Sequence, residues 1–273
     1  SESNLEQKHC DLGLAIQEIT EEIVILMAQE AKRLTGSKAC VLAGGVALNC
    51  VANGKLKDAG IFESIFIQPA AGDAGGALGA ALAAHYIYFD QARMVDATRM
   101  DAMSGSYLGP SYSDKEIEQM AKQNQAVFTH YADFSELSAK TAELLAEGNV
   151  IGWFQGRMEF GPRALGGRSI LGDPRNPEMQ KKLNLKIKYR EGFRPFAPSV
   201  LAEDVSEYFE CDTISPYMLL VHGVQPARRN AMPKNYEQLD MMDKLYFLRS
   251  DLPSITHIDY SARIQTVHAE TNP

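Results

Sequence analysis

Apolar residues recur at steps of three and four near the start of the chain. They lie at Leu12, Ile16, Ile19, Ile23, Leu26, Met27 and Leu34. This spacing matches the 3.6-residue period of an amphipathic helix and predicts a helix over residues 12–34. We expect Asp11 to cap its beginning and Gly36 to end it.

Two short apolar runs follow, and each leads into glycine. Residues 39–43 read as a buried strand that ends at Gly44 and Gly45, where a short helix can start over 46–49. Residues 65–67 read as a second strand, and GDAGG at 72–76 opens a helix to about His85. Glycine at such corners lets backbone N–H groups approach a phosphate, which the helix N-terminus also favours. Close helix packing explains a single glycine pair equally well, but two such corners favour a nucleotide or phosphate cleft.

No sustained period is visible over residues 90–110. We place a linker there, between domains at 1–89 and 111–273. After it, a capping box of Ser113 and Glu116 predicts a helix to Gln123. Further helices are expected at 135–147 and 177–188, strands at 127–131, 150–154, 217–221 and 262–267, an extended segment at 193–201 and a polar insertion at 228–251. The alternation of helices and strands predicts an α/β fold.

Positive charge is concentrated in one segment of an acidic chain. Residues 157–194 hold ten Lys and Arg and four acids, although the net charge of the chain is −8. Such a contrast favours an anionic ligand at that segment. Lys181, Lys182 and Lys186 are better explained as a solvated helix face. Arg163 and Arg194 lie on glycine- and proline-rich backbone instead, which suits bidentate capture of phosphate or carboxylate.

Composition restricts the classes of partner. A pI near 5.3 argues against a general nucleic-acid or membrane-surface protein. We find no long apolar run and no signal peptide, and the four cysteines form no CxxC pair, so we expect a cytoplasmic protein. The chain begins without methionine and stops in a polar tail soon after its last strand-like run, so we expect a flank to be missing.

Five motifs resemble the carbamoyltransferase family that includes nodulation-factor and cephamycin carbamoyltransferases. They are GGVALN at 44–49, GDAGGALGAAL at 72–82, EFGPRALGGRSIL at 159–171, KYREGFRPFAPSVL at 188–201 and THIDYSARIQTV at 256–267. The resemblance implies the end of an actin/sugar-kinase-like domain followed by most of a YrdC-like α/β domain. It also implies an enzyme that forms carbamoyl-adenylate from carbamoyl phosphate and ATP and passes the carbamoyl group to a hydroxyl of a small acceptor. Because family members have flanks that this chain lacks, binding without turnover is one expected outcome for the chain alone.

The resemblance also implies site residues. Lys188, Arg163, Arg194 and Arg263 match basic residues of the carbamoyl-phosphate and ATP site. We predict the first three to be catalytic and Arg263 to bind substrate, together with Arg157 and Arg168 of the positive segment. The nucleotide is expected at Gly44, Gly45, Asn49, Gly75 and Gly76.

Metal ions are implied in the same way. Mg²⁺ is expected with ATP, and an iron-like divalent ion at the transfer site. Asp73 matches the family's metal-ligating aspartate, although its position alone favours a helix cap.

Two other functions stay open. The first is synthesis of threonylcarbamoyl-adenylate for tRNA modification, which would require threonine and bicarbonate. The second is a non-catalytic nucleotide- or RNA-binding module, which the acidity of the chain disfavours. The sequence leaves a homo-oligomer open and does not identify the acceptor.

Overall fold

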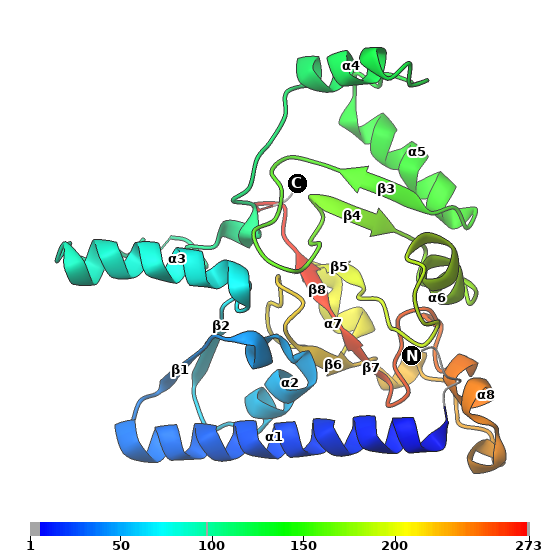
Figure 1. Ribbon diagram of the computed structural model, residues 1–273. Coiled ribbons are helices and arrows are strands. Elements are labelled where there is room, and N and C mark those ends of the chain that lie inside the picture. Colours follow the sequence, from blue (N-terminus) through cyan, green and yellow to red (C-terminus); the bar gives the residue numbers. More distant parts are fainter. Residues whose placement is uncertain (1–5, 97, 272–273) are drawn as a thin grey trace.

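The computed structural model describes residues 6–96 and 98–271. Within them the strands form four two-stranded sheets, two parallel and two antiparallel, with helices around them (Figure 1). The predicted α/β class is confirmed. The more detailed assignments, to actin/sugar-kinase-like and YrdC-like domains, stay predictions.

The amino-terminal part contains a long helix, a parallel strand pair and a short helix. They are α1 (Gln7–Thr35), β1 (Ala39–Leu42), α2 (Cys50–Asp58) and β2 (Ser64–Ile67). The predicted helix and both strands are therefore confirmed. Gly36 ends α1 in the left-handed conformation with φ 63°, as expected.

The start of α1 differs from the prediction. Glu6 is the N-cap, and it forms a capping box with His9, whereas Asp11 lies inside the helix. The apolar residues from which the helix was predicted are not buried: Leu12, Ile16 and Ile19 are each more than half exposed. A different face of α1 meets α2: Ala28 packs with Leu56 in a buried cluster, and the carboxylate of buried Glu21 accepts from Lys55.

The glycine-rich corners form as expected. A 3₁₀ turn covers Gly45–Leu48, and α3 (Asp73–Ala83) continues into a π-helical turn at Ala84–Tyr88. The predicted linker is irregular except for a 3₁₀ turn at Ser104–Ser106, yet Met103 is buried. Its hydrophobic cluster contains residues from both sides of the linker, namely Ala47, Ile67, Ala71, Leu165, Tyr217, Met218 and Leu219. The core therefore runs across the linker.

The middle of the chain confirms two helices and corrects one strand. α4 (Asp114–Gln123) begins with the predicted capping box, and α5 (Phe134–Ala146) follows. Residues 127–131 are not a strand: they have no pairing partner, and Val127 is fully exposed. β3 (Ile151–Phe154) forms as predicted. It pairs antiparallel with β4 (Arg168–Leu171), a strand that the sequence pattern missed.

Short elements fill the positive segment and the region after it. α6 (Met179–Lys182) and a π-helical turn at Leu183–Ile187 make up the predicted helix, and β5 (Ser199–Leu201) ends the extended segment. A 3₁₀ turn (Ala202–Asp204) leads to α7 (Val205–Tyr208). The strand predicted from residue 217 begins later, as β6 (Val221–Gly223). Residues 217–219 are buried as expected, but Met218 has φ 54°, which interrupts an extended strand.

The predicted last strand is divided between two sheets. β7 (Ser261–Arg263) pairs antiparallel with β6, and β8 (Gln265–Val267) pairs parallel with β5. The insertion contains 3₁₀ turns at Pro226–Arg228 and Tyr236–Gln238 and the helix α8 (Met241–Tyr246). In the described part of the chain no helix is long and apolar enough to cross a membrane.

Candidate anion-binding site

A buried carboxylate shapes the loop that carries Arg163. Glu159 accepts hydrogen bonds from the backbone N–H groups of Leu165 (2.6 Å), Gly167 (2.8 Å) and Arg168 (3.2 Å). Its side chain is buried, so these bonds compensate for the loss of water around the carboxylate. We call the loop over residues 159–168 the arginine loop. Its shape is therefore held by hydrogen bonds between its own backbone and the side chain of Glu159.

The arginine loop lies against both glycine-rich corners. Gly161 has φ 133°, and a Cβ built there would lie 3.4 Å from Ala70, so the loop approaches the second corner closely. At the first corner, Nη2 of Arg163 donates to the carbonyl of Leu48 (3.1 Å). Nε of Arg163 is buried and has no hydrogen-bond partner in the described part of the chain. One face of this guanidinium is therefore anchored while a donor is left unused.

Arg263 lies on β7, where it pairs with Val221 of β6. Its Nε is also buried without a partner. Burial lowers the pKa of Arg263, and the positive charges of Arg163 and Arg190 lower it further. Cys50 acts in the opposite direction and raises this pKa. Within residues 6–96 and 98–271, neither Arg163 nor Arg263 forms an ion pair with a carboxylate. Two guanidinium groups within electrostatic reach of each other thus each have an unused donor, an arrangement that favours an anion. We call Arg163 and Arg263 the arginine pair.

Gln265 joins the arginine loop to the sheet of β5 and β8. Its Nε2 donates to the carbonyl of Leu165 (2.8 Å), and its Oε1 accepts from the hydroxyl of Ser199 (2.8 Å). Neither Gln265 nor Glu159 was predicted to be a site residue. Both belong to the quoted motifs, but only the fold shows that they support the loop.

The other predicted catalytic residues lie in the turn after α6. Arg194 pairs with Glu191 at 2.9 Å, and Lys188 is exposed. Arg190, which was not predicted, donates to Asn184 (2.7 Å) and lies over the ring of Phe196. Burial lowers the pKa of Arg190, and the charge of Arg194 adds to this effect. Because Arg190 also lowers the pKa of Arg263, it extends the positive region toward the pair.

Two of the arginines that were predicted to bind substrate, Arg157 and Arg168, donate hydrogen bonds to backbone carbonyls. Arg157 donates to the carbonyls of Gly109 and Leu108, both at 2.9 Å. Arg168 donates to several carbonyls, among them that of Gly167 at 2.7 Å, and lies over the ring of Phe154. These contacts tie the arginine loop to the linker, and the structure does not bring either side chain to the arginine pair.

The predicted nucleotide-binding residues divide into two groups. Gly44 donates its N–H to Ala71, a Cβ at Gly75 would lie 2.1 Å from the carbonyl oxygen of Ala70, and Asn49 caps α2, so these three have structural tasks. Gly45 and Gly76 lie beside open space instead. The backbone N–H of Gly45, at the start of its 3₁₀ turn, can approach a ligand, whereas Gly76 lies inside α3, where its N–H belongs to the helix.

Asp73 is exposed at the first position of α3. Among the described residues no three His, Cys, Asp or Glu side chains gather in a way that could hold a metal ion. Asp73 could supply one ligand, which is too few for the iron-like ion. The residues that the structure describes therefore do not by themselves fit that metal.

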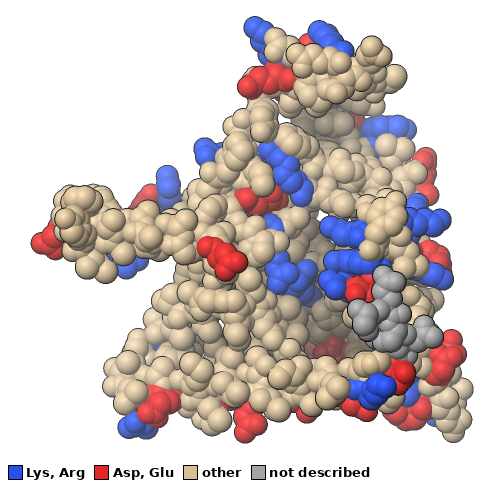
Figure 2. All heavy atoms as spheres, in the orientation of Figure 1, with Lys and Arg blue, Asp and Glu red and all other residues tan. Residues whose placement is uncertain are grey.

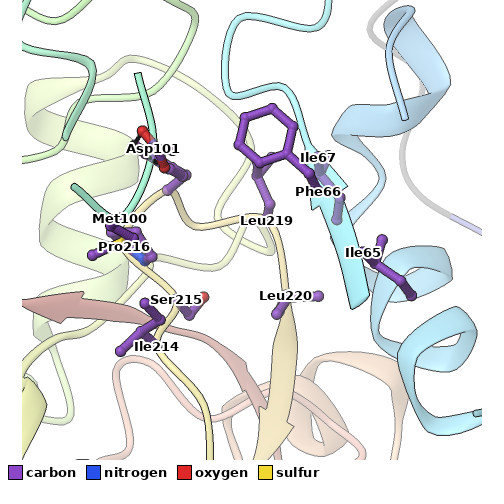
Figure 3. A pocket seen from close by; sticks show the side chains of 11 residues that line it. Ile65, Phe66, Ile67, Met100, Asp101, Ile214, Ser215, Pro216, Leu219 and Leu220 are labelled. Atoms are coloured by element: carbon purple, nitrogen blue, oxygen red, sulfur yellow. Dashed lines mark hydrogen bonds between the residues drawn. The ribbon is translucent and has the colours of Figure 1, made fainter. Parts of the chain in front are cut away.

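Lys and Arg side chains surround a hollow between α2 and α6 (Figure 2). A separate pocket of about 210 Å³ lies beside β2 and is lined by Ile65, Phe66 and Ile67, with Asp101 at its side (Figure 3). Because no Lys or Arg lines this pocket, the arginine pair belongs to a different part of the surface.

The fold and the arginine pair define an α/β protein with a candidate anion-binding site. The chain belongs to the carbamoyltransferase family. Residues 2–82 match the family model described as Carbamoyltransferase N-terminus, and residues 142–273 match Carbamoyltransferase C-terminus. This confirms the resemblance that the five motifs indicated.

Similar proteins carry several names. The chain is 57% identical to an uncharacterized protein of Synechocystis, 39% identical to the nodulation protein NolO of Bradyrhizobium diazoefficiens and 31% identical to a 3'-hydroxymethylcephem-O-carbamoyltransferase of Amycolatopsis lactamdurans. These matches cover 100%, 98% and 99% of this chain, but 44% of each relative. The chain thus spans less than half the length of the relatives it matches.

Proposed function

We propose that this chain forms the carbamoyl-donor site of an ATP-dependent O-carbamoyltransferase. The arginine pair carries the proposal, because two partly buried guanidinium groups without an acid require an anion to balance them. A family relative is named as an O-carbamoyltransferase of a hydroxymethyl compound. Carbamoyl phosphate is an anion of the size and charge that such a pair would hold.

The pair would first bind the phosphate group of carbamoyl phosphate. A guanidinium presents several N–H donors in a plane, and Nε of both residues is unused. When the bond between the carbamoyl carbon and the phosphate oxygen breaks, negative charge grows on that oxygen. Donors already in place would stabilise this charge without rearrangement.

The proposed reaction has two balanced parts. Carbamoyl phosphate, water and ATP give carbamoyl-adenylate, phosphate and pyrophosphate. The adenylate then passes its carbamoyl group to a hydroxyl of a small acceptor, and AMP leaves. In the first part, Lys188, Arg194 and Arg163 would oppose the charge of the polyphosphate, while the N–H of Gly45 approaches it.

Metal ions have a limited place in this proposal. Mg²⁺ would enter with the phosphates of ATP and reduce their negative charge. For the iron-like ion Asp73 is a single ligand, so no step of the proposal passes through that metal. The residues named in this proposal bind carbamoyl phosphate and ATP, and none of them is assigned to the acceptor hydroxyl.

Calorimetric titration with carbamoyl phosphate, and pyrophosphate release from Mg²⁺–ATP, test the proposal. We expect Arg163→Gln and Arg263→Gln to weaken binding by about ten- to hundredfold, because each removes charged hydrogen bonds. Arg33→Gln is the matched control, since Arg33 also carries one positive charge but lies exposed on α1 beside Glu30. Lys188→Ala should reduce pyrophosphate release without changing the melting temperature, because an exposed lysine contributes little stability.

The outcomes separate the candidate functions. Binding of carbamoyl phosphate that depends on the pair and not on Arg33 supports the proposal even if the chain alone does not turn over. Pyrophosphate release that requires threonine and bicarbonate would favour threonylcarbamoyl-adenylate synthesis. Unchanged affinity in both arginine variants would contradict the assignment of the site.

A further inference from the structure

Asn184 is a fully buried polar residue next to an exposed, positively charged turn. It lies in the π-helical turn Leu183–Ile187 that follows α6, and its side chain has no contact with solvent. We call the residues that follow, 188–194, the basic turn, because they carry Lys188, Arg190 and Arg194. A buried amide needs hydrogen-bond partners, and here the basic turn supplies them.

The amide nitrogen of Asn184 holds the end of the basic turn. Its Nδ2 donates to the carbonyl of Gly192 (3.1 Å) and to the carbonyl of Arg194 (2.8 Å). An amide nitrogen has two hydrogens, so both are used. These two bonds draw the end of the turn back against the helical segment from which it starts.

The middle of the basic turn is held by the same residue. Nε of Arg190 donates to Oδ1 of Asn184 (2.7 Å), and the backbone N–H of Arg190 donates to the main-chain carbonyl of Asn184 (3.0 Å). The guanidinium of Arg190 also lies over the ring of Phe196. The orientation of the amide is therefore fixed, with its oxygen toward a donor and its nitrogen toward two carbonyls.

The backbone at the start of the basic turn has an unusual conformation. The N–H of Lys188 donates to the carbonyl of Leu183, five residues earlier (2.9 Å), which is the hydrogen bond of a π-helix. Tyr189 then has φ 47°, in the left-handed region that a bulky residue rarely adopts. Such a backbone persists where surrounding contacts fix it, and both features are frequent at functional sites. The hydrogen bonds of Asn184 are contacts of this kind.

We propose that Asn184 is a positioning residue: its amide holds the basic turn so that Lys188 and Arg194 reach the triphosphate of ATP. The choice of the triphosphate rests on the proposed function. On an ordered turn, two long side chains lose less conformational freedom when they bind than on a mobile one. Arg194 pairs with Glu191 of the same turn, but both side chains are about half exposed, so a phosphate can replace this carboxylate. Asn184 acts through the turn and not by contact with ATP.

Calorimetric titration with Mg²⁺–ATP tests this role. Asn184→Leu has nearly the same size but no hydrogen-bonding group, and we expect it to weaken ATP binding about tenfold. The affinity for carbamoyl phosphate, which the proposed function assigns to the arginine pair, should change by less than about twofold. Asn149→Leu is the matched control, because the amide of Asn149 also donates to a backbone carbonyl but is exposed after α5. It should change neither affinity.

A double-mutant cycle separates positioning from a general loss of structure. Asn184→Leu is combined in turn with Lys188→Ala and with Arg194→Ala. Because the amide acts through these two cations, Asn184→Leu should lower ATP affinity by only about threefold in either background. A full tenfold loss in both backgrounds would overturn the inference, since a loosened fold weakens binding with or without either cation.

Tryptic cleavage under native conditions gives a reading that needs no ligand. Trypsin cuts after Lys and Arg where the backbone is mobile, so cleavage after Lys188 and Arg190 reports on the order of the turn. We expect Asn184→Leu to speed this cleavage at least about tenfold and to leave cleavage after Arg33 in α1 unchanged. Asn184→Asp is the second variant if Asn184→Leu fails to fold, because its carboxylate accepts from Arg190 but donates to neither carbonyl.

The results separate this inference from the proposed function. If Mg²⁺–ATP binds and Asn184→Leu leaves its affinity unchanged, the inference fails and the proposed function stands. If ATP and carbamoyl phosphate affinities fall equally, Asn184 supports the fold as a whole and the inference is overturned. If the unsubstituted chain binds no Mg²⁺–ATP, the proposed function fails together with the phosphate role of the turn, whereas faster cleavage would still show that Asn184 holds it.

Discussion

Gln265 donates a hydrogen bond of 2.8 Å to the carbonyl oxygen of Leu165. The two residues are 100 positions apart in the sequence and both are buried. This contact fixes the arginine loop to β8, the strand that directly follows Arg263. The relative position of the two arginines therefore depends on a neutral amide.

Replacement of Gln265 should weaken both stability and ligand binding. Gln265→Leu removes one of the two donors to the carbonyl of Leu165, which keeps the hydroxyl of Tyr107, and removes the acceptor of the Ser199 hydroxyl, so we expect a loss of about 1 kcal/mol in the free energy of unfolding. Carbamoyl phosphate affinity should fall as well, because Arg163 is carried by the same loop. Urea unfolding and calorimetry measure the two effects. Gln91→Leu, at an exposed position, should change neither.

The ion pair of Asp173 and Arg175 should make the free energy of unfolding depend on pH in the acidic range. The hydrogen bonds from Arg175 lower the pKa of Asp173 in the folded state below its ordinary value. The carboxylate therefore stabilises the fold above the unfolded pKa, about 3.9. That contribution is lost as pH falls through the lower folded value. Asp173→Asn should accordingly be less stable than the unsubstituted chain at pH 7, with a difference that shrinks near pH 3. A difference independent of pH would contradict this account.

His257 should add a second pH dependence at higher pH. Burial lowers its pKa in the folded state, with Arg263 adding to the effect and Asp259 opposing it. The unfolded chain then binds the proton more readily, so stability falls as pH drops below the ordinary histidine value of about 6.5. His222, whose pKa burial also lowers, acts in the same direction.

His257→Asn keeps a donor for Ser261 but does not titrate. We expect its urea midpoint to vary less than that of the unsubstituted chain between pH 7.5 and pH 5. A remaining slope is assigned to His222, and His222→Asn should reduce it. Identical slopes in the unsubstituted chain and in both variants would be inconsistent with burial as the cause.

Arg249 should control the insertion at residues 228–251. It is buried, and its guanidinium donates to the carbonyls of Lys244, Leu245, Phe247 and Ile258 and to the hydroxyl of Tyr236. Lysine has fewer donors and no planar geometry, so Arg249→Lys should leave several carbonyls unsatisfied. We expect faster proteolytic cleavage within 228–251, measured under native conditions. Arg99→Lys, at an exposed arginine, is the control.

Local signals were sufficient for most helices. The start of α4 follows from Ser113 and Glu116, and the end of α1 from Gly36, because each motif satisfies backbone groups within a few residues. The sequence signal for the start of α1 was misleading, because Glu6 caps this helix and Asp11, the predicted cap, lies inside it. The apolar stripe of α1 predicted a helix correctly but did not predict that Leu12 and Ile16 would be exposed.

The sequence by itself determined the helices, the glycine-rich corners, the positive segment and the five motifs that mark the family. Only the tertiary structure decided which strands pair and which arginines meet. Residues 127–131 have a strand composition but find no partner, and residues 261–267 divide between two sheets. Arg157 binds carbonyls while Arg163 and Arg263 come together. The physical reason is that strand pairing and guanidinium contacts depend on groups far away in the chain, whose positions no local pattern contains.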